Sequence, residues 1–508
     1  MNSFKPMLLT SLKSYDRAQF AKDVTAGIIV AIIALPLSIA LALASGVGPE
    51  AGIFTAIVAG FVISALGGSC VQIAGPTAAF ATIVAGIVAR DGLEGLMTAT
   101  ILAGVFLIIM GFCHFGSLIK FIPYTITTGF TSGIAVTIVI GQLKDFCGVT
   151  YPDGVKPIET MEKLKAFVEN FSTISPDALI VGGVSLAILI VSPLIFKKIP
   201  GSLIAVIAGI LMVQFLPLHV STIGNLYTIS NALPTLHLPV FDMKLIQSAI
   251  PNAFTIAVLA AIESLLSCVV ADGMINSKHR SDTELIAQGA GNIASALFGG
   301  IPATGAIART AANIKNGGRT PVAGMVHSIT LVIVLVVLMP FAGMIPMPTI
   351  AAILFLVAYN MCQWRTFVHL VRTAPKSDII VLFTTFVLTV VFDLVVEIEI
   401  GMVLACLLFI KRMSEETHAD SWVYVDDDSP AVDEHLQKLS LEIRVYEITG
   451  PLFFGAADAI EHIVVKDFTK CLVLRMRSVP AIDSTAMNAL QNLTKLCESK
   501  GITPSSLM

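Results

Sequence analysis

Long apolar segments dominate this chain and restrict what it can fold into. Residues 24–44 contain no charged side chain, and another apolar run includes residues 379–392. A bilayer core requires about 20 apolar residues for each spanning helix. Only 13% of the 508 residues are charged, whereas the average soluble protein has about 25%. We therefore expect an integral membrane protein with many spanning helices.

The apolar runs predict fourteen spanning segments in two groups of seven, within a membrane domain at residues 24–412. The first group lies near residues 24–44, 51–67, 74–89, 94–113, 122–142, 178–196 and 202–217. The second group lies near residues 250–271, 283–299, 303–314, 321–340, 346–361, 378–393 and 396–411. The segments that begin near residues 74 and 303 are too short or too broken for full spans.

Basic residues predict the orientation of these segments. Residues 1–23 form a polar, basic tail, and the apolar run that follows is too long to be the core of a cleavable signal peptide. If this tail is cytoplasmic, inner loops with residues such as Lys197, Lys278 and Arg365 carry about twice as many basic residues as the outer loops. We expect a multi-pass protein of the cytoplasmic (inner) membrane with both termini in the cytoplasm.

The two groups of segments resemble each other in sequence. ALPLSIALALASG (34–46) aligns with AIESLLSCVVADG (261–273), and ISALGGS (63–69) with ASALFGG (294–300). Chance is the alternative explanation for such short matches. Seven helices in each repeat would give the two halves opposite topology. Inverted repeats at about 24–217 and 250–411 are typical of secondary transporters, which bind substrate near the membrane midplane.

Each half contains one broken helix. The breaks read GGSCVQIAGPTAAFATIVAG (67–86) and FGGIPATGAIARTAANIKNGG (298–318). Each begins as extended chain and is predicted to turn helical near residues 75–77 or 304–305. Backbone without internal hydrogen bonds is tolerated inside a bilayer only where it lines a cavity or is buried in protein. Two helix N-termini that point at one another would offer free N–H groups and positive dipole ends to an anion.

Arg309 lies about one turn into the second broken helix. A charge within the membrane costs about 2.5–3.5 kcal/mol on insertion scales, so it requires a partner or a hydrated cavity. One interpretation is a positive centre for an anion. The alternatives are an arginine that reaches the cytoplasmic surface, or one held by carbonyl groups or by an acidic neighbour.

Glu263 lies in the middle of a predicted span, in AVLAAIESLLSCVV. It could couple transport to a cation by binding H⁺ or Na⁺, and Ser267, four residues later on the same helix face, could add an oxygen ligand. The alternatives are a permanently protonated glutamate or a static ion pair with Arg309.

Together these motifs resemble a known family. IALPLSIALALASG, GPTAAF, IESLL, HRSDTELIAQGAGNI and GGIPATGAIARTAANI are similar to the SulP anion transporters, also called solute carrier family 26. The resemblance covers nearly the whole chain. It favours the bacterial branch that includes the dicarboxylic acid transporter DauA over the cyanobacterial bicarbonate transporter BicA.

The resemblance implies an all-α membrane domain built as a 7+7 inverted repeat, with core and gate subdomains and an elevator-type movement. It implies that Glu263 couples a cation and that the chain is a homodimer in lipid. Vertebrate members of the family often have Pro-Gln in the first helix, whereas this chain has Pro36-Leu37. No polar ligand from the first helix is therefore assigned. The anion site that it implies comprises Gly75, Pro76, Thr77, Ala78, Ala79, Phe80, Thr304, Gly305, Ala306, Ala308 and Arg309.

Family members carry sulfate, bicarbonate, chloride, oxalate or C4-dicarboxylates such as succinate. A dianion would suit two dipole ends together with Arg309, which slightly favours sulfate or a dicarboxylate. We expect secondary active transport of sulfate or a related inorganic anion, coupled to H⁺ or Na⁺. An uncoupled anion channel is the alternative mechanism, and flux against a gradient would separate the two.

A smaller domain is predicted to follow the membrane domain. Residues 413–437 are acidic and polar and are typical of a linker or a connecting strand. Residues 438–508 have an α/β pattern that resembles a STAS domain with its last strand and helices missing. Ser484, in the Asp-Ser pair of one loop, is a candidate regulatory phosphorylation site, and the domain could bind a cytoplasmic partner.

Other function classes lack sequence support. The eight cysteines occur singly, without metal-ligand spacing, so no metal or cofactor is expected. The net charge of −4 does not indicate nucleic-acid binding. No HExxH or GxSxG motif is present, and His114, His279 and His327 were expected in solvated positions near inner helix ends, so we expect no enzyme.

Overall fold

The structure of the protein, a computed structural model, describes most of the chain. It covers residues 4–117, 123–152, 157–195, 200–239, 242–391, 394–415, 418–422, 442–455, 460, 463 and 469–507. The chain divides into two compact units, Met1–Gly401 and Met402–Met508. The first unit is helical, and the second is built on a sheet.

Helices lie in all fourteen segments that the apolar runs predict. In the first half these are α2 (Arg17–Ala44), α3 (Pro49–Leu66), η2 (Ala78–Phe80) with α4 (Ala81–Phe112), α5 (Tyr124–Cys147), α7 (Pro176–Ile195) and α8 (Gly201–Phe215). In the second half they are α10 (Met243–Ile275), α11 (Ser281–Leu297), α12 (Ile307–Lys315), α13 (Val322–Ala342), α14 (Met347–Cys362), α16 (Lys376–Val391) and α17 (Leu394–Glu415).

One of these helices covers two predicted segments. Helix α4 is interrupted at Gly92, whose φ of 68° and ψ of −168° are not helical. Glycine adopts a positive φ without the steric penalty that other residues carry. Within the described residues, eight helices are long and apolar enough to cross a membrane. A count of fourteen spans therefore stays a prediction, although every predicted segment contains a helix.

Several shorter elements were not predicted. They are α1 (Met7–Ser11), η1 (Leu12–Ser14), α6 (Thr160–Glu169), η4 (Phe171–Thr173), α9 (Ile223–Leu226) and α15 (Trp364–Thr373). A search for long apolar runs misses such elements because they are short or carry polar residues. In α6, for example, Glu159 and Glu162 form a capping box that satisfies N–H groups at the helix start.

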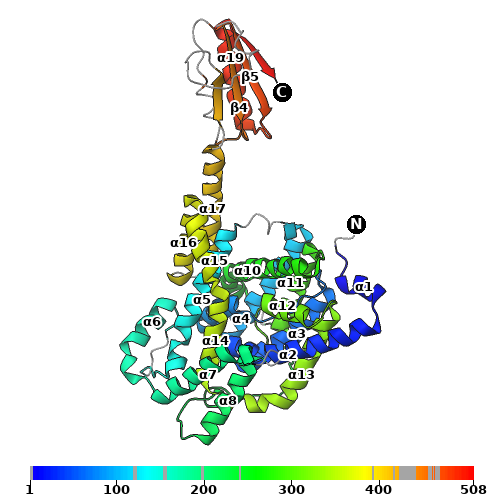
Figure 1. Ribbon diagram of the computed structural model, residues 1–508, viewed down its shortest axis with the longest axis vertical. Helices are drawn as coiled ribbons and strands as arrows, with labels where there is room; N and C mark the ends of the chain where they lie inside the picture. The colour runs from blue at the N-terminus through cyan, green and yellow to red at the C-terminus, as the bar shows by residue number, and fades with distance from the viewer. Residues whose placement is uncertain are drawn as a thin grey trace. The chain divides into compact units, whose positions relative to one another are not determined.

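The long helices of the first unit pack in two groups (Figure 1). In one group, α11 packs on α3 and α4, α10 packs on α4, and α13 packs on α2 and α3. In the other, α14 packs on α5 and α7, α16 packs on α5, and α7 packs on α8. The first group contains both broken helices, so it corresponds to the core subdomain of the predicted architecture, and the second corresponds to the gate.

The packing pattern repeats between the two halves of the chain. Counted by order within each half, the contact of α2 with α13 corresponds to that of α10 with the second part of α4. The contact of α5 with α16 likewise corresponds to that of α14 with α7. Helices α3 and α11 are each the second segment of their half, so exchanging the halves leaves their contact unchanged. An internal repeat of two similar halves produces this exchange symmetry.

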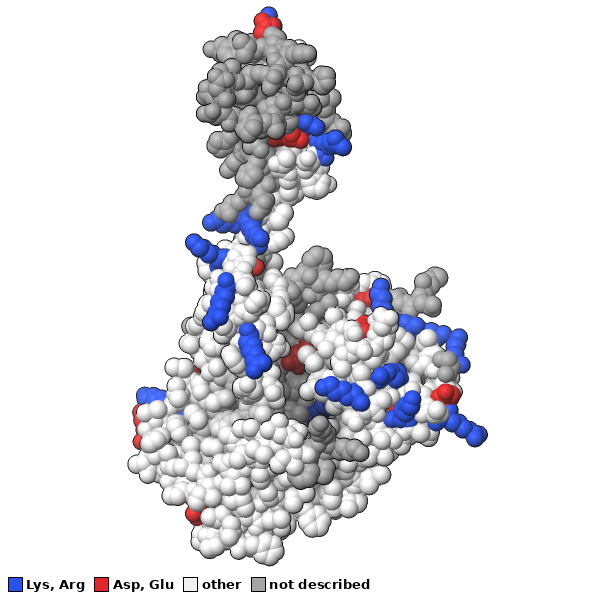
Figure 2. Space-filling model, viewed as in Figure 1, with Lys and Arg blue, Asp and Glu red and all other residues white. Residues whose placement is uncertain are grey.

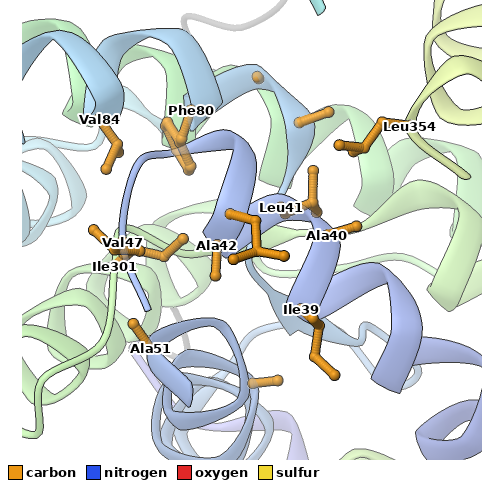
Figure 3. Packing of buried hydrophobic residues seen from close by; sticks show 14 of the residues in the cluster. Ile39, Ala40, Leu41, Ala42, Val47, Ala51, Phe80, Val84, Ile301 and Leu354 are labelled. Carbon is orange, nitrogen blue, oxygen red and sulfur yellow. The ribbon is translucent and has the colours of Figure 1, made fainter. Parts of the chain in front are cut away.

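Small residues allow the core helices to approach closely, as is typical inside membranes. A Cβ atom on Gly289 of α11 would lie 2.4 Å from the carbonyl oxygen of Gly104 in α4. A Cβ on Gly52 of α3 would lie 2.1 Å from the carbonyl oxygen of Ser38 in α2. Figure 3 shows buried residues such as Phe80 and Ile301 in one cluster with residues of α2.

The second unit contains a four-stranded sheet of order β3-β4-β5-β6. The strands are β3 (His418–Trp422), β4 (Ile443–Thr449), β5 (Cys471–Ser478) and β6 (Thr503–Leu507). Strand β3 pairs antiparallel with β4, and the other pairs are parallel. Helix α19 (Ser484–Ser499) connects β5 to β6 and contributes Ala486, Leu493 and Cys497 to the core of this unit.

Strands β3 and β6 lie in the part of the chain that was predicted to follow the membrane domain. Strand β3 lies inside residues 413–437, the stretch predicted as a linker or connecting strand. No strand was predicted after residue 501, where the structure has β6 paired with β5. That the domain lacks its last strand and helices stays a prediction. Residues Thr503–Leu507 include Pro504 and two serines. Apart from Thr503 the segment has no β-branched or aromatic residue, so its composition gives little indication of a strand. Residues 423–441 lie outside the described part.

Candidate functional site

The two breaks in the predicted helices meet as a short sheet. Strand β1 (Ala74–Gly75) pairs antiparallel with β2 (Thr304–Gly305), with Ala74 opposite Gly305 and Gly75 opposite Thr304. The N–H of Ala306 also donates to the carbonyl oxygen of Ile73, at 2.9 Å. The extended backbone of each break is therefore paired with the other break, which removes the cost of unpaired polar groups inside a membrane.

Helices begin directly after both strands. Helix η2 starts at Ala78 and leads into α4, and α12 starts at Ile307. These starts lie one to three residues after the predicted ones. The first intrahelical bond of α12 is donated by Thr310, so the N–H groups of its first turn have no partner inside the helix. The sheet thus places two amide-rich helix starts beside one another.

The predicted anion-site residues differ in exposure. Those that are buried are Gly75, Pro76, Ala78, Ala79, Phe80, Thr304, Gly305 and Arg309. Thr77 and Ala306 are partly exposed, and Ala308 is exposed. The open side of the site is therefore formed by Thr77 and the first turn of α12. Figure 2 shows the first unit hollowed between its two helix groups, with Lys and Arg side chains gathered mostly at one end.

Arg309 is 1% exposed and lies between α2 and the first break. Its Nη2 donates to Ser38 Oγ and to the carbonyl oxygen of Pro76, each at 3.3 Å. Its Nε and Nη1 have no hydrogen-bond partner among the described residues. The side chain therefore does not reach a membrane surface, and no ion pair with Glu263 is found within the described part of the chain. Of the alternatives considered, only a carbonyl contact is present.

Two glycines permit this arrangement. A Cβ on Gly75 would lie 2.4 Å from Arg309 Nη1, and a Cβ on Gly305 would lie 2.0 Å from Gln72 Nε2. Any side chain at either position would displace the polar group behind it. The glycines of both strands are therefore required by close approach, which the sequence motif alone does not reveal.

Glu263 contacts the first break directly. Its Oε2 accepts a hydrogen bond of 2.9 Å from Thr77 Oγ1. Ser267, predicted as a second oxygen ligand, instead donates to Thr310 Oγ1 at 3.4 Å. Thr310 Oγ1 also accepts from Ile73 N, on the N-terminal side of β1, at 3.1 Å. The structure brings Glu263 to Thr77 and Ser267 to α12, so the two residues have different partners.

A buried glutamate that was not predicted supports the first break. Glu284, 1% exposed, accepts hydrogen bonds from Gly68 N, Ser69 N and Gln72 Nε2 at 2.9–3.2 Å. Gln288 Nε2 and Ser264 Oγ also donate to it. Glu284 therefore ties α10 and α11 to the chain that leads into β1. The HRSDTELIAQGAGNI motif contains it, but its partners Gly68, Ser69 and Gln72 are more than 200 residues away in the sequence.

Ser38 and His327 were also missed. Ser38 provides a first-helix hydroxyl at Arg309, two residues after Pro36, where no polar ligand was assigned. His327 was expected in a solvated position, but it is 0% exposed within α13. That expectation was wrong because α13 begins at Val322 and the histidine lies more than one turn inside it.

A further polar cluster lies between α10 and α11. His279 Nδ1 lies 2.7 Å from Asp272 Oδ2, and its Nε2 lies 3.0 Å from Ser281 Oγ. Asp272 also accepts from His279 N and Ser277 Oγ. Because Asp272 bonds both backbone and side chains of this connection, the cluster fixes the turn between the helices. Motif searches did not find this Ser–His–Asp set.

Ser484, the candidate regulatory residue, lies in the second unit. It is exposed and is the first residue of α19. The side chain of Asp483 caps this helix by accepting from Ala486 N at 2.8 Å. The position is accessible to modification, and its regulatory role stays a prediction.

Comparison with known proteins gives consistent matches. The profile of the sulfate permease family ("Sulfate permease family") matches residues 20–385, and that of the STAS domain matches residues 437–503. The chain is 40% identical to "Putative sulfate transporter YvdB" of Bacillus subtilis, over 95% of this chain and 90% of that protein. It is 34% identical to the bicarbonate transporter BicA of Picosynechococcus, over 92% of this chain and 85% of that protein.

Solved structures agree in fold. The transmembrane domain of a cyanobacterial bicarbonate transporter BicA matches with a TM-score of 0.67 at 29% identity, covering 77% of this chain and 98% of that chain. A murine anion transporter, member A9 of solute carrier family 26, matches with a TM-score of 0.87 at 19% identity, covering 98% of this chain and 87% of that chain. Assignment to the DauA branch stays a prediction, and the supposedly more distant BicA is among these relatives.

Proposed function

We propose, on the premise that this chain belongs to the sulfate permease family, that it moves sulfate or a related small oxyanion by coupled, elevator-type transport. The chain is a multi-pass membrane protein of a family of anion transporters. Our proposal adds four points to this family assignment. They are the transported anion, the elevator mechanism, the coupling cation and the location in the cytoplasmic membrane. The pairing of β1 with β2 is the observation that carries the proposal.

Anion binding at this sheet rests on three local features. The first turns of η2 and α12 supply N–H groups without helical partners, and their dipoles add positive potential. Arg309 adds a full charge beside the sheet, with its Nη2 directed at Ser38 Oγ and the carbonyl oxygen of Pro76. The exposed first turn of α12, including Ala308, gives a route to this site. In a low-dielectric setting these groups attract an anion strongly.

Movement as an elevator is supported by how the residues are distributed. Both breaks, Arg309 and Glu263 belong to helices of the core group, and none belongs to the gate group. The anion site can therefore move as one body against α5, α7 and α14 without changing its own geometry. A site built from both groups would be pulled apart by such a movement.

Cation coupling is supported by the hydrogen bond between Thr77 and Glu263. A carboxylate this close to the anion would repel it. Binding of H⁺ or Na⁺ at Glu263 removes that repulsion, so cation and anion favour each other's binding, as reciprocal linkage requires. The site therefore suits symport, whereas a channel would have no use for this carboxylate.

Bicarbonate is the second candidate cargo, because named bicarbonate transporters are 34% and 32% identical to this chain. A C4-dicarboxylate such as succinate is the third. Two helix starts and one arginine suit a dianion better than a monoanion, which places sulfate and succinate ahead of bicarbonate on charge alone.

Uptake by proteoliposomes tests the proposal. Labelled sulfate, bicarbonate and succinate are offered separately, each with an imposed pH gradient, a Na⁺ gradient or neither. We expect one anion to accumulate above its external concentration with only one gradient. Equilibration without accumulation under every gradient would identify a channel. Absence of flux for all three anions would refute the proposed cargo.

The remaining assignments complete the proposal. We also propose a homodimer in lipid with cytoplasmic termini. The one-sided gathering of basic residues in Figure 2 supports the orientation. The second unit is proposed to bind a cytoplasmic partner, with Ser484 as its modification site. A Ser484→Cys variant tests the orientation. A thiol reagent that does not cross membranes should label position 484 in lysed cells but not in intact cells.

A further inference from the structure

Several buried polar atoms beside the first break have no partner. His327 is 0% exposed, and neither ring nitrogen has a hydrogen-bond partner among the described residues. The same holds for Ser64 Oγ in α3, Arg309 Nε and Nη1 in α12, and Asn313 Oδ1 one turn later in α12. These four side chains are at most 5% exposed. None of the bonds already described accounts for these atoms.

Three of these groups lie in a row along α3. A Cβ on Gly75 would lie 2.4 Å from Arg309 Nη1 and 3.6 Å from Ala56. One turn further along α3, a Cβ on Gly60 would lie 4.0 Å from His327 Nδ1 and 3.2 Å from the carbonyl oxygen of Ala74. Both polar side chains therefore approach β1 from the side that faces α3.

The next turn of α3 continues the row. Ser64 Oγ lies 2.1 Å from the position of a Cβ on Gly324, and the carbonyl oxygen of Gln72 lies 3.5 Å from the same position. Ser328 Oγ donates to the carbonyl oxygen of Ala56 at 3.1 Å, which fixes α13 against α3. Successive turns are about 5.4 Å apart, too far for direct hydrogen bonds but matched to one bridging water.

Leaving these groups unpaired would be costly. A buried polar group without a partner costs about 1–3 kcal/mol, and buried groups in native proteins nearly always bond to protein or to ordered water. A buried water typically makes about three hydrogen bonds. The row offers donors from Arg309, the amphoteric groups of His327 and Ser64, and the acceptor carbonyls of Ala74 and Gln72, so a water has partners at each step.

We propose that ordered water molecules fill this seam between α3, α13 and β1, and that His327 acts through them as a positioning residue for Arg309. The water hydrates the guanidinium from the side opposite Ser38. This keeps Nη2 directed at Ser38 and Pro76, beside the open end of the site. The seam is separate from the anion route, and only the effect of His327 on transport rests on the proposed function.

Radiolytic labelling of the purified wild-type protein tests the seam itself. Hydroxyl radicals formed from bound water modify adjacent side chains even when these are closed to bulk solvent. We expect His327 to be modified at least about 5-fold faster than Met339, which lies in the same helix, is 2% exposed and belongs to the apolar cluster. Exposed Trp364 serves as the positive control.

Substitution tests the positioning role. His327→Leu removes both nitrogens, and we expect the apparent KM for the transported anion to rise about 10-fold with little change in kcat. His327→Gln retains a donor and an acceptor and should stay within about 3-fold of wild type. A purely structural role would lower the amount of active protein and leave KM unchanged.

The outcomes separate the two proposals. A labelling rate at His327 no higher than at Met339 would overturn the water seam, whatever the transport assays show. Equal KM values for wild type and His327→Leu would overturn the positioning role. If labelling succeeds while no anion is transported, the seam stands and the proposed function fails. If the leucine variant does not fold, the wild-type labelling result still decides the seam.

Discussion

The two broken helices use the same backbone device but carry different side chains. Both pair through a two-residue strand and then start a helix. The first break is neutral, and Thr77 bonds to the carboxylate of Glu263. The second carries Arg309, whose charge is buried behind the glycine of the first. The repeat thus supplies a symmetric frame. Under the proposed function, its divergence links cation coupling to the first break, through the contact of Thr77 with Glu263 of α10, and anion attraction to the second break.

Removal of the Arg309 charge should have the largest effect among the tests of this difference between the two breaks. Arg309→Ala should lower apparent anion affinity about 100-fold, because a hydrogen bond to a charged group is worth about 1.5–3 kcal/mol. The measurement is the concentration dependence of uptake in proteoliposomes. Lys315→Ala, at the other end of the same helix, is the matched control and should have little effect. An unchanged affinity in Arg309→Ala would remove the anion-attracting role from the second half.

Glu263→Gln tests the coupling role linked to the first break. The amide can still accept from Thr77 but cannot bind H⁺ or Na⁺ as a carboxylate does. With one coupled proton, a pH difference of one unit supports about 10-fold accumulation, and we expect the variant to lose it while anion exchange persists. Accumulation equal to wild type would move coupling to another residue. Glu169→Gln, on the exposed helix α6, serves as the control.

Substitution of the strand glycines sharpens the comparison. Gly75→Ala places a Cβ 2.4 Å from Arg309 Nη1 and should weaken anion affinity about 10-fold. Gly305→Ala instead meets Gln72 Nε2 and should mainly lower thermal stability. Gly86→Ala in α4, where a Cβ has open space, is the control for both. If the two strand variants gave the same profile, the halves would not differ as described.

The threonines of the two breaks should show the smallest difference. Thr77→Val removes the hydroxyl that donates to Glu263, and we expect about a 3-fold loss of coupled uptake. Thr304 donates to the carbonyl oxygen of Ala260 at 2.9 Å, so Thr304→Val should affect melting temperature rather than coupling. Both changes conserve shape. Equal effects on coupled uptake would contradict the assignment of Glu263 to the first break.

The sequence predicts the features of the two breaks that depend on local signals, and it does not predict those that depend on long-range contacts. Apolar runs and the Gly/Pro/Thr breaks are local signals, so the helical segments and both interruptions were located to within a few residues. The partners of Arg309 and Glu284 and the burial of His327 depend on contacts with residues far away in the sequence. Ser38 lies 271 positions from Arg309, and one sequence gives no pattern for such a pair.

An experimental map of the protein with its transported anion bound tests the central claim most directly. We predict density for the anion between Thr77–Phe80 and the first turn of α12, within reach of Arg309, with Ala74 paired to Gly305 beneath it. The same map of Arg309→Ala should lack that density. An anion bound elsewhere, or two continuous helices that lie apart at residues 74–89 and 303–314, would contradict the account.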